Sequence, residues 1–124
     1  MELTQYFKSI VDEEQSAVVI CDMNHKIIYM NPTACSQYNK SGGAALLGCS
    51  LLDCHNDISR EKICKIIEWF QADKSHNRIY ISHNERKNRD AYMIALRNEQ
   101  GDLIGYYEKH EYRNRETEPF YHFE

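Results

Sequence analysis

Hydrophobic and polar residues alternate in short runs near the start of this chain, and the runs predict a β-hairpin. Residues 17–22 form a β-branched run, and residues 26–31 form a second apolar, strand-like run. Between them, Met23, Asn24 and His25 tolerate the backbone angles of a tight turn. We therefore expect two antiparallel strands within residues 17–31.

Helical patterns follow the hairpin. Asn31 precedes Pro32, an order that favours a helix over residues 32–38, because asparagine caps helices and the fixed φ of proline suits the first turn. Residues 57–74 carry the longest internal helical pattern, with Asn56 or Asp57 as its cap. Its apolar stripe consists of Ile63, Ile66, Ile67 and Phe70.

Three further strands are expected over residues 76–83, 90–97 and 103–112, separated by polar turns. Before the hairpin, apolar residues recur at intervals of three and four, which predicts an amphipathic helix within residues 1–15. These residues are Leu3, Tyr6, Phe7, Ile10 and Val11. The helix needs a partner surface, and one candidate is the core of its own domain.

The order strand, turn, strand and capped helix resembles the opening of a PAS domain. Asp22, Tyr29, Asn31 and Ala34 stand where PAS sequences commonly carry such residues. The resemblance covers residues 16–113 and implies an α+β fold, a five-stranded antiparallel sheet with helices on one face. Residues 1–15 would then be the N-terminal helix and residues 114–124 a tail. The resemblance implies that this helix packs on the outer face of the sheet or on the same helix of a second subunit.

A second resemblance lies ahead of the long helix. The segment LLGCSLLDCHNDISREKI is similar to a bacterial PAS subgroup that carries Gly-x-Ser-Leu-x-Asp-Cys-His. PAS domains hold haem, flavin, small metabolites or nothing between the long helix and the sheet. The resemblance therefore implies a sensor or interaction module.

The composition and net charge of the chain limit which classes of partner are expected. The 124 residues fit one domain, and the formal charge of −4 offers no general attraction to nucleic acid or anionic membranes. No apolar run approaches the roughly 20 residues that span a bilayer, and the N-terminus lacks the pattern of a signal peptide. Five cysteines without paired spacing suit a reducing compartment, so we expect a cytoplasmic protein.

No catalytic signature accompanies these elements. The serines lack a Gly-x-Ser-x-Gly motif, and Gly42-Gly43 lacks the Lys-Ser/Thr ending of a phosphate-binding loop. We expect a non-enzymatic module. Because no effector domain follows residue 113, its output would act in trans on another protein.

The resemblance implies that a ligand is held by side chains that the PAS geometry turns inward. The candidates are Ile20, Tyr29, Cys35, Tyr38, Leu52, His55, Ile63, Ile67, Tyr80, Tyr92, Ile94 and Tyr106. A register error of one residue would invert every strand assignment in this set. An unidentified small molecule is the expected partner.

His55 is the candidate axial ligand if the bound group is haem. The alternative is an ordinary turn in which His55 bonds the backbone. Leu51 stands where light-sensing PAS domains carry their flavin-reactive cysteine, so cysteinyl-flavin chemistry is not expected, although redox flavin binding stays open. Cys49, Cys54 and His55 lack the paired spacing of a zinc site, and no metal site is expected without haem.

Several polar residues have no predicted function. We expect His76, His83, His110 and His122 to be solvated or bonded to the backbone, and Arg97 and Glu108 to be solvated. The alternative to a ligand sensor is a ligand-free module for dimerisation or partner binding. The N-terminal helix and the tyrosines of the last three strands favour that alternative, and a homodimer is expected in either case.

Overall fold

The computed structural model describes residues 1–123. The predicted hairpin is confirmed as β1 (Val18–Asp22) and β2 (Ile27–Met30), which pair antiparallel around a turn where His25 adopts a φ of 65°. The later strands are β3 (Arg78–Asn84), β4 (Arg89–Arg97) and β5 (Leu103–Tyr112). All five form one antiparallel sheet in the order β2-β1-β5-β4-β3, which confirms the predicted fold class.

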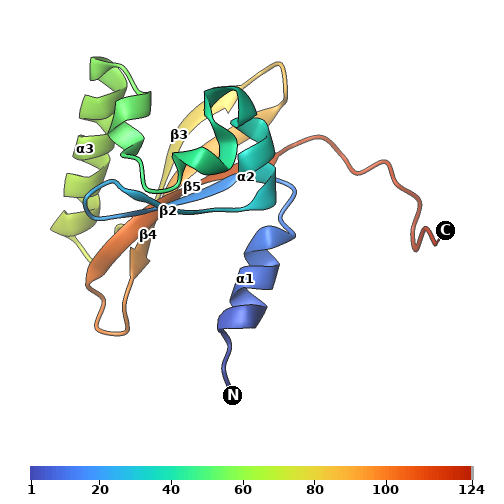
Figure 1. Cartoon of the computed structure of the whole chain (residues 1–124), viewed down its shortest axis with the longest axis horizontal. Coiled ribbons are helices and arrows are strands. Elements are labelled where there is room, and N and C mark those ends of the chain that lie inside the picture. Colours follow the sequence, from blue (N-terminus) through green and yellow to red (C-terminus); the bar gives the residue numbers. More distant parts are fainter. Residues whose placement is uncertain (124) are drawn as a thin grey trace.

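The helices after β2 cover one face of the sheet, here called the inner face (Figure 1). They are α2 (Pro32–Gln37) and α3 (Asp57–Ala72), with short 3-10 turns η1 (Asn39–Ser41), η2 (Gly43–Leu46) and η3 (Leu51–Cys54) between them. The core lies between this layer and the inner face. Its most deeply buried side chains include Phe70 of α3 and Tyr106 of β5.

Asn31 joins the hairpin, α2 and the segment before β1. As predicted, its side chain caps α2, with Oδ1 accepting from the amide of Ala34 at 2.9 Å. Oδ1 also accepts from the amide of Val18 at 2.9 Å, and Nδ2 donates to the carbonyls of Val11 and Ser16 at 3.0 Å. The buried amide therefore has partners for both its donors and its acceptor.

The N-terminal helix α1 (Thr4–Asp12) does not cap the core. None of its residues is buried, and Figure 1 shows it extending from the start of β1 away from α2 and α3. Its connection to the domain is polar: the hydroxyl of Tyr29 donates to Asp12, which also pairs with Lys8 at 2.7 Å. The apolar side chains of α1 remain exposed.

One glycine sets the spacing of the central strands. A Cβ atom at Gly105 of β5 would lie 2.3 Å from the backbone carbonyl oxygen of Cys21 in β1. Since no real Cβ approaches an oxygen so closely, any other residue here would separate the two strands. Gly105 thus permits the pairing that joins the hairpin to the rest of the sheet.

The cysteines, the helices and the tail complete the description of the fold. All five cysteines are free thiols. Within residues 1–123, no helix is long and apolar enough to cross a membrane. The aromatic residues Phe120, Tyr121 and Phe123 of the tail are almost fully exposed, so they do not pack back on the domain.

Candidate ligand-binding cleft

A cleft of about 570 Å³ lies between α3, η3 and the inner faces of β3 and β4. Its walls are mainly apolar, because α3 turns its buried stripe toward the sheet and β3 and β4 contribute Ile79, Ile81 and Met93. The apolar lining consists of Leu51, Ile63, Ile66, Ile79, Ile81 and Met93. The polar lining consists of His55, Ser59, Lys62, Lys65, Tyr80, Ser82 and Glu108.

A second, smaller cavity of about 210 Å³ lies on the other side of η3, toward α2. Its lining is Val19, Ile27, Met30, Tyr38, Ser41, Leu46, Leu51, Cys54, His55 and Glu108. Leu51, His55 and Glu108 border both spaces. These three side chains therefore stand between the cleft and the small cavity.

Glu108 of β5 is the acidic group in this region. Its side chain is 33% exposed, and its nearest charged or chargeable partner is His110, whose Nε2 lies 3.8 Å from Oε1. That separation is longer than a hydrogen bond. His110 itself is 3% exposed, and its Nδ1 has no hydrogen-bond partner among the described residues. Buried polar atoms normally have partners, so this imidazole nitrogen is exceptional, as is the buried Nε of Arg89.

Tyr38 and Tyr106 are buried phenols of the interior, and both are uncharged. Burial, followed by the nearby carboxylate of Glu108, raises the pKa of Tyr38 to about 12. Burial likewise raises the pKa of Tyr106, whose hydroxyl lies 2.7 Å from Nδ1 of His25. Both phenols therefore stay protonated at neutral pH, because ionising them would place a charge in an apolar interior.

His55 lies at the end of η3 and borders both spaces. Its Nδ1 donates to the carbonyl of Leu51 at 2.8 Å, the backbone bond expected of a turn histidine. This bond places the proton on Nδ1 and leaves Nε2 as the atom available to an iron ion. A haem ligand and a turn residue are thus both compatible with His55. No cluster of three metal-ligating side chains occurs among residues 1–123.

The structure separates the predicted inward residues into three groups. Tyr38, His55 and Ile63 line the two spaces. Ile67 and Tyr106 are buried in the core, and Cys35 and Leu52 pack against it without lining either space. Tyr80 belongs to the third group, on the outer face: it contributes to the rim of the cleft, but it pairs with Tyr92 and its hydroxyl donates to Asp90 at 2.8 Å.

Five of the residues predicted to face inward lie on the opposite, outer face of the sheet. They are Ile20, Tyr29, Tyr80, Tyr92 and Ile94. The register explains the error: Cys21 and Ala95 pair with the buried Tyr106, so Ile20 and Ile94, one position earlier, point the other way.

The sequence reasoning also missed most of the cleft lining. Ile79, Ile81, Met93 and Glu108 alternate with outward residues on the same strands. Ile66 belonged to the predicted apolar stripe of α3 and could have been included on that basis. For Glu108, the signal was a lone acidic residue at the same parity as Tyr106, within a strand whose inward side chains are large.

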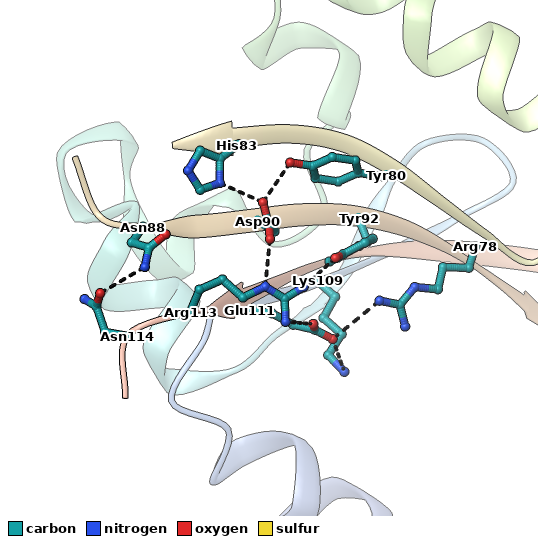
Figure 2. A network of polar contacts seen from close by, with 10 residues as sticks. All are labelled: Arg78, Tyr80, His83, Asn88, Asp90, Tyr92, Lys109, Glu111, Arg113 and Asn114. Atoms are coloured by element: carbon teal, nitrogen blue, oxygen red, sulfur yellow. Dashed lines mark hydrogen bonds and ion pairs between the residues drawn. The ribbon is translucent and has the colours of Figure 1, made fainter. Parts of the chain in front are cut away.

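Asp90 forms the centre of a polar network on the outer face, shown in Figure 2. Its carboxylate accepts from Tyr80 at 2.8 Å and from His83 Nδ1 and Arg113 Nε at 2.7 Å. The hydrogen bond from Arg113, followed by those from Tyr80 and His83, lowers the pKa of Asp90 well below its usual range. Arg113 also donates to the hydroxyl of Tyr92 at 2.5 Å.

The structure differs from several of the environments predicted for polar residues. His83 is not solvated but pairs with Asp90, and His110 is buried. For His76 the prediction of a backbone bond is confirmed, since Nδ1 donates to the carbonyl of Trp69 at 2.7 Å. The solvated position expected for Glu108 is wrong in part, because its side chain borders both the cleft and the small cavity.

Arg97 is also bonded rather than solvated. From the end of β4, its Nη2 donates to the carbonyl of Phe70 at 2.6 Å and to those of Asp73 and His76 at 3.2 Å. Its Nη1 donates to the carbonyl of Gly101 at 3.0 Å. Arg97 thus holds the C-terminal end of α3, and with it one end of the cleft, against the sheet.

Sequence comparison finds no match for this chain, whereas comparison with solved structures finds proteins of the same fold. No protein-family model matches the sequence, and no curated protein matches it. Among solved structures, a PAS domain from Colwellia psychrerythraea is 13% identical with a TM-score of 0.66, covering 89% of this chain and 96% of that one. The PAS domain of BvgS from Bordetella pertussis is 10% identical with a TM-score of 0.58, covering 90% and 86%.

A third solved structure, described as a sensory box sensor histidine kinase from Vibrio cholerae, is 14% identical with a TM-score of 0.53, covering 84% of this chain and 86% of that one. At these identities the likeness concerns the fold. This chain therefore has the PAS fold, and the similarity to the Gly-x-Ser-Leu-x-Asp-Cys-His subgroup stays a prediction.

Proposed function

We propose that this chain is a sensory signalling module that binds a small molecule in the cleft between α3 and the inner face of the sheet. The observation that carries the proposal is the cleft itself, about 570 Å³ with apolar walls and a few inward polar groups. Pockets of this size and character are typical of small-ligand sites. The PAS domains and the sensor kinase that share the fold support a sensory function.

Signal output in this proposal uses protein contacts made in trans, in the cytoplasm, with a homodimer as the working unit. β1 and β5 are neighbours in the sheet, and they connect directly to α1 and to the tail. A ligand that shifts the inner face would change the packing of β1 and β5. That change would alter the positions of α1, which precedes β1, and of the tail, which follows β5. No catalytic step is part of this function.

The first test is to identify what the purified protein carries. Protein prepared without added cofactor is denatured, extracted and examined by mass spectrometry, and its absorbance spectrum is recorded before denaturation. We expect a stoichiometric small molecule. A Soret band that disappears in His55→Ala would identify haem with His55 as its ligand, and a flavin band would identify a redox flavin.

A variant that fills the cleft tests where the molecule is held. Ile66→Trp places an indole in the cleft, and we expect it to abolish retention of the extracted molecule. Ile58→Trp is the matched control, because Ile58 lies on the same helix, is 68% exposed and does not line the cleft. Equal retention by the wild-type protein and both variants would contradict the proposed site.

A second candidate function is a ligand-free dimerisation module, which the exposed apolar face of α1 favours. Tyr6, Phe7 and Ile10 are all more than half exposed. A groove of about 240 Å³ runs beside them, lined by Ile10 and by outer-face residues such as Ile20 and Tyr107. Exposed apolar patches of this kind mark interaction surfaces.

Sedimentation velocity separates the two candidates when it is combined with extraction. The dimerisation function predicts a dimer with no retained molecule, and Phe7→Glu is expected to convert that dimer to a monomer. Glu2→Lys is the control for a charge change at the exposed start of the chain. A monomeric wild-type protein at micromolar concentration would remove this candidate.

A further inference from the structure

We infer that the ligand of the cleft carries a positively charged amine that binds the carboxylate of Glu108, attached to an apolar body. This inference rests on the proposed function and names the chemical class of its ligand. The Glu108 side chain is two-thirds buried and borders both the cleft and the small cavity, and its carboxylate has no hydrogen bond within the described chain. Its acceptor positions are therefore available to a ligand.

The charges around Glu108 favour a cation over an anion or a neutral group. Within residues 1–123, no lysine or arginine lies within ion-pairing distance of this carboxylate, and His110 approaches it only to 3.8 Å. A carboxylate in an apolar space is costly without a partner, and a charge-assisted hydrogen bond removes that cost. An ammonium group provides both the charge and the donors.

The lysines of the cleft do not oppose this assignment. Lys65 is well exposed at the rim and pairs with Glu61 at 3.3 Å, while Lys62 is exposed on the same helix. Charges in contact with water are screened by solvent and salt. Glu108 is less exposed than either lysine, so its carboxylate is less screened than their ammonium groups.

His110 acts as a positioning residue in this site. It follows Glu108 by two residues on the same face of β5, and its side chain is 4% exposed. The imidazole fills the space next to the carboxylate without bonding it, which leaves the carboxylate facing the two spaces. An amine on Glu108 would lie beside Leu51 and Met93, and its hydrocarbon body would contact Ile63 and Ile66.

The test uses three probes with the same phenyl body and different head groups. Calorimetric titration with 2-phenylethylamine at pH 7 is expected to give saturable binding, and 2-phenylethanol and phenylacetate are expected to bind at least tenfold more weakly. Glu108→Gln should weaken binding of the amine at least tenfold. Glu111→Gln is the matched control, because Glu111 lies on the same strand and faces outward.

Each other result overturns the inference. Equal binding of amine and alcohol, unchanged binding in Glu108→Gln, or binding of none of the three probes would each contradict a cationic ligand. The proposed function is judged separately by extraction: an anionic or neutral molecule that Ile66→Trp loses would preserve the cleft as a ligand site and reject only its charge. Circular dichroism of both glutamine variants confirms that they are folded.

Discussion

Two buried polar side chains in this protein, Asn31 and His110, are in opposite situations. Asn31 is 0% exposed and its amide is bonded to four backbone groups from three segments. His110 is 3% exposed, yet its Nδ1 has no partner in the described chain and its Nε2 approaches Glu108 only to 3.8 Å. Equal burial thus accompanies complete bonding in one region and almost none in the other.

The difference shows that Asn31 stabilises the fold, whereas His110 lies beside the proposed ligand site. A fully bonded buried amide stabilises the fold, because each lost bond would leave another group without a partner. An unbonded buried imidazole contributes no such stability, and it is tolerated next to the carboxylate that we assign to the ligand. Mutations at the two positions should therefore change the free energy of unfolding by different amounts and in opposite directions.

The largest expected effect is that of Asn31→Ala. Removing the amide leaves the backbone groups of Val18, Val11 and Ser16 without their partner and uncaps α2, so we expect a loss of about 3 kcal/mol in the free energy of unfolding. Urea denaturation measures it. Asn56→Ala is the control: Asn56 makes a single cap bond, to the amide of Ser59, and should cost about 1 kcal/mol. Equal losses would contradict the distinction.

A smaller effect of opposite sign is expected for His110→Leu. Leucine keeps most of the volume and removes an imidazole atom that has no partner, so the free energy of unfolding should stay unchanged or rise by up to about 1 kcal/mol. The same denaturation experiment measures it. A loss of more than about 2 kcal/mol would mean that the imidazole is well bonded in solution, and the contrast with Asn31 would disappear.

The smallest change in stability at neutral pH is expected for Asp90→Asn, in the polar network of the outer face. Because the bonded carboxylate of Asp90 has a lowered pKa in the fold, its contribution to stability is present above the unfolded pKa of about 4 and is lost as the pH falls toward the lower folded value. We expect Asp90→Asn to weaken the decrease in urea midpoint between pH 5 and pH 3. Asp57→Asn, at a fully exposed carboxyl, should leave that decrease unchanged.

Local signals in the sequence were sufficient to predict the main helices and strands of the fold. The cap of α2 by Asn31 and the cap of α3 by Asn56 depend on bonds within three residues, so the residue order specifies the first and narrows the second to Asn56 or Asp57. The hairpin and the three later strands follow from alternation and turn residues in the same way. These features need no knowledge of distant segments.

The site was harder to predict because it depends on register and on distant partners. Ile94 and Tyr106 are both large and apolar, and only the pairing of Tyr106 with Ala95 shows that Ile94 faces outward. Asp90 bonds Arg113, which is 23 residues later, and Arg97 bonds Phe70, which is 27 residues earlier. Composition and periodicity contain no information about such pairs.

The strand order also has a consequence for how the chain folds as it is synthesised. β1 is paired with β2 on one side and with β5 on the other, yet β5 is made last, more than 80 residues after β1. Until β5 leaves the ribosome, the hairpin keeps an open edge with unpaired backbone groups. Nascent or truncated chains that stop before residue 103 are therefore expected to aggregate or to bind chaperones, and the complete sheet is expected to form late and cooperatively.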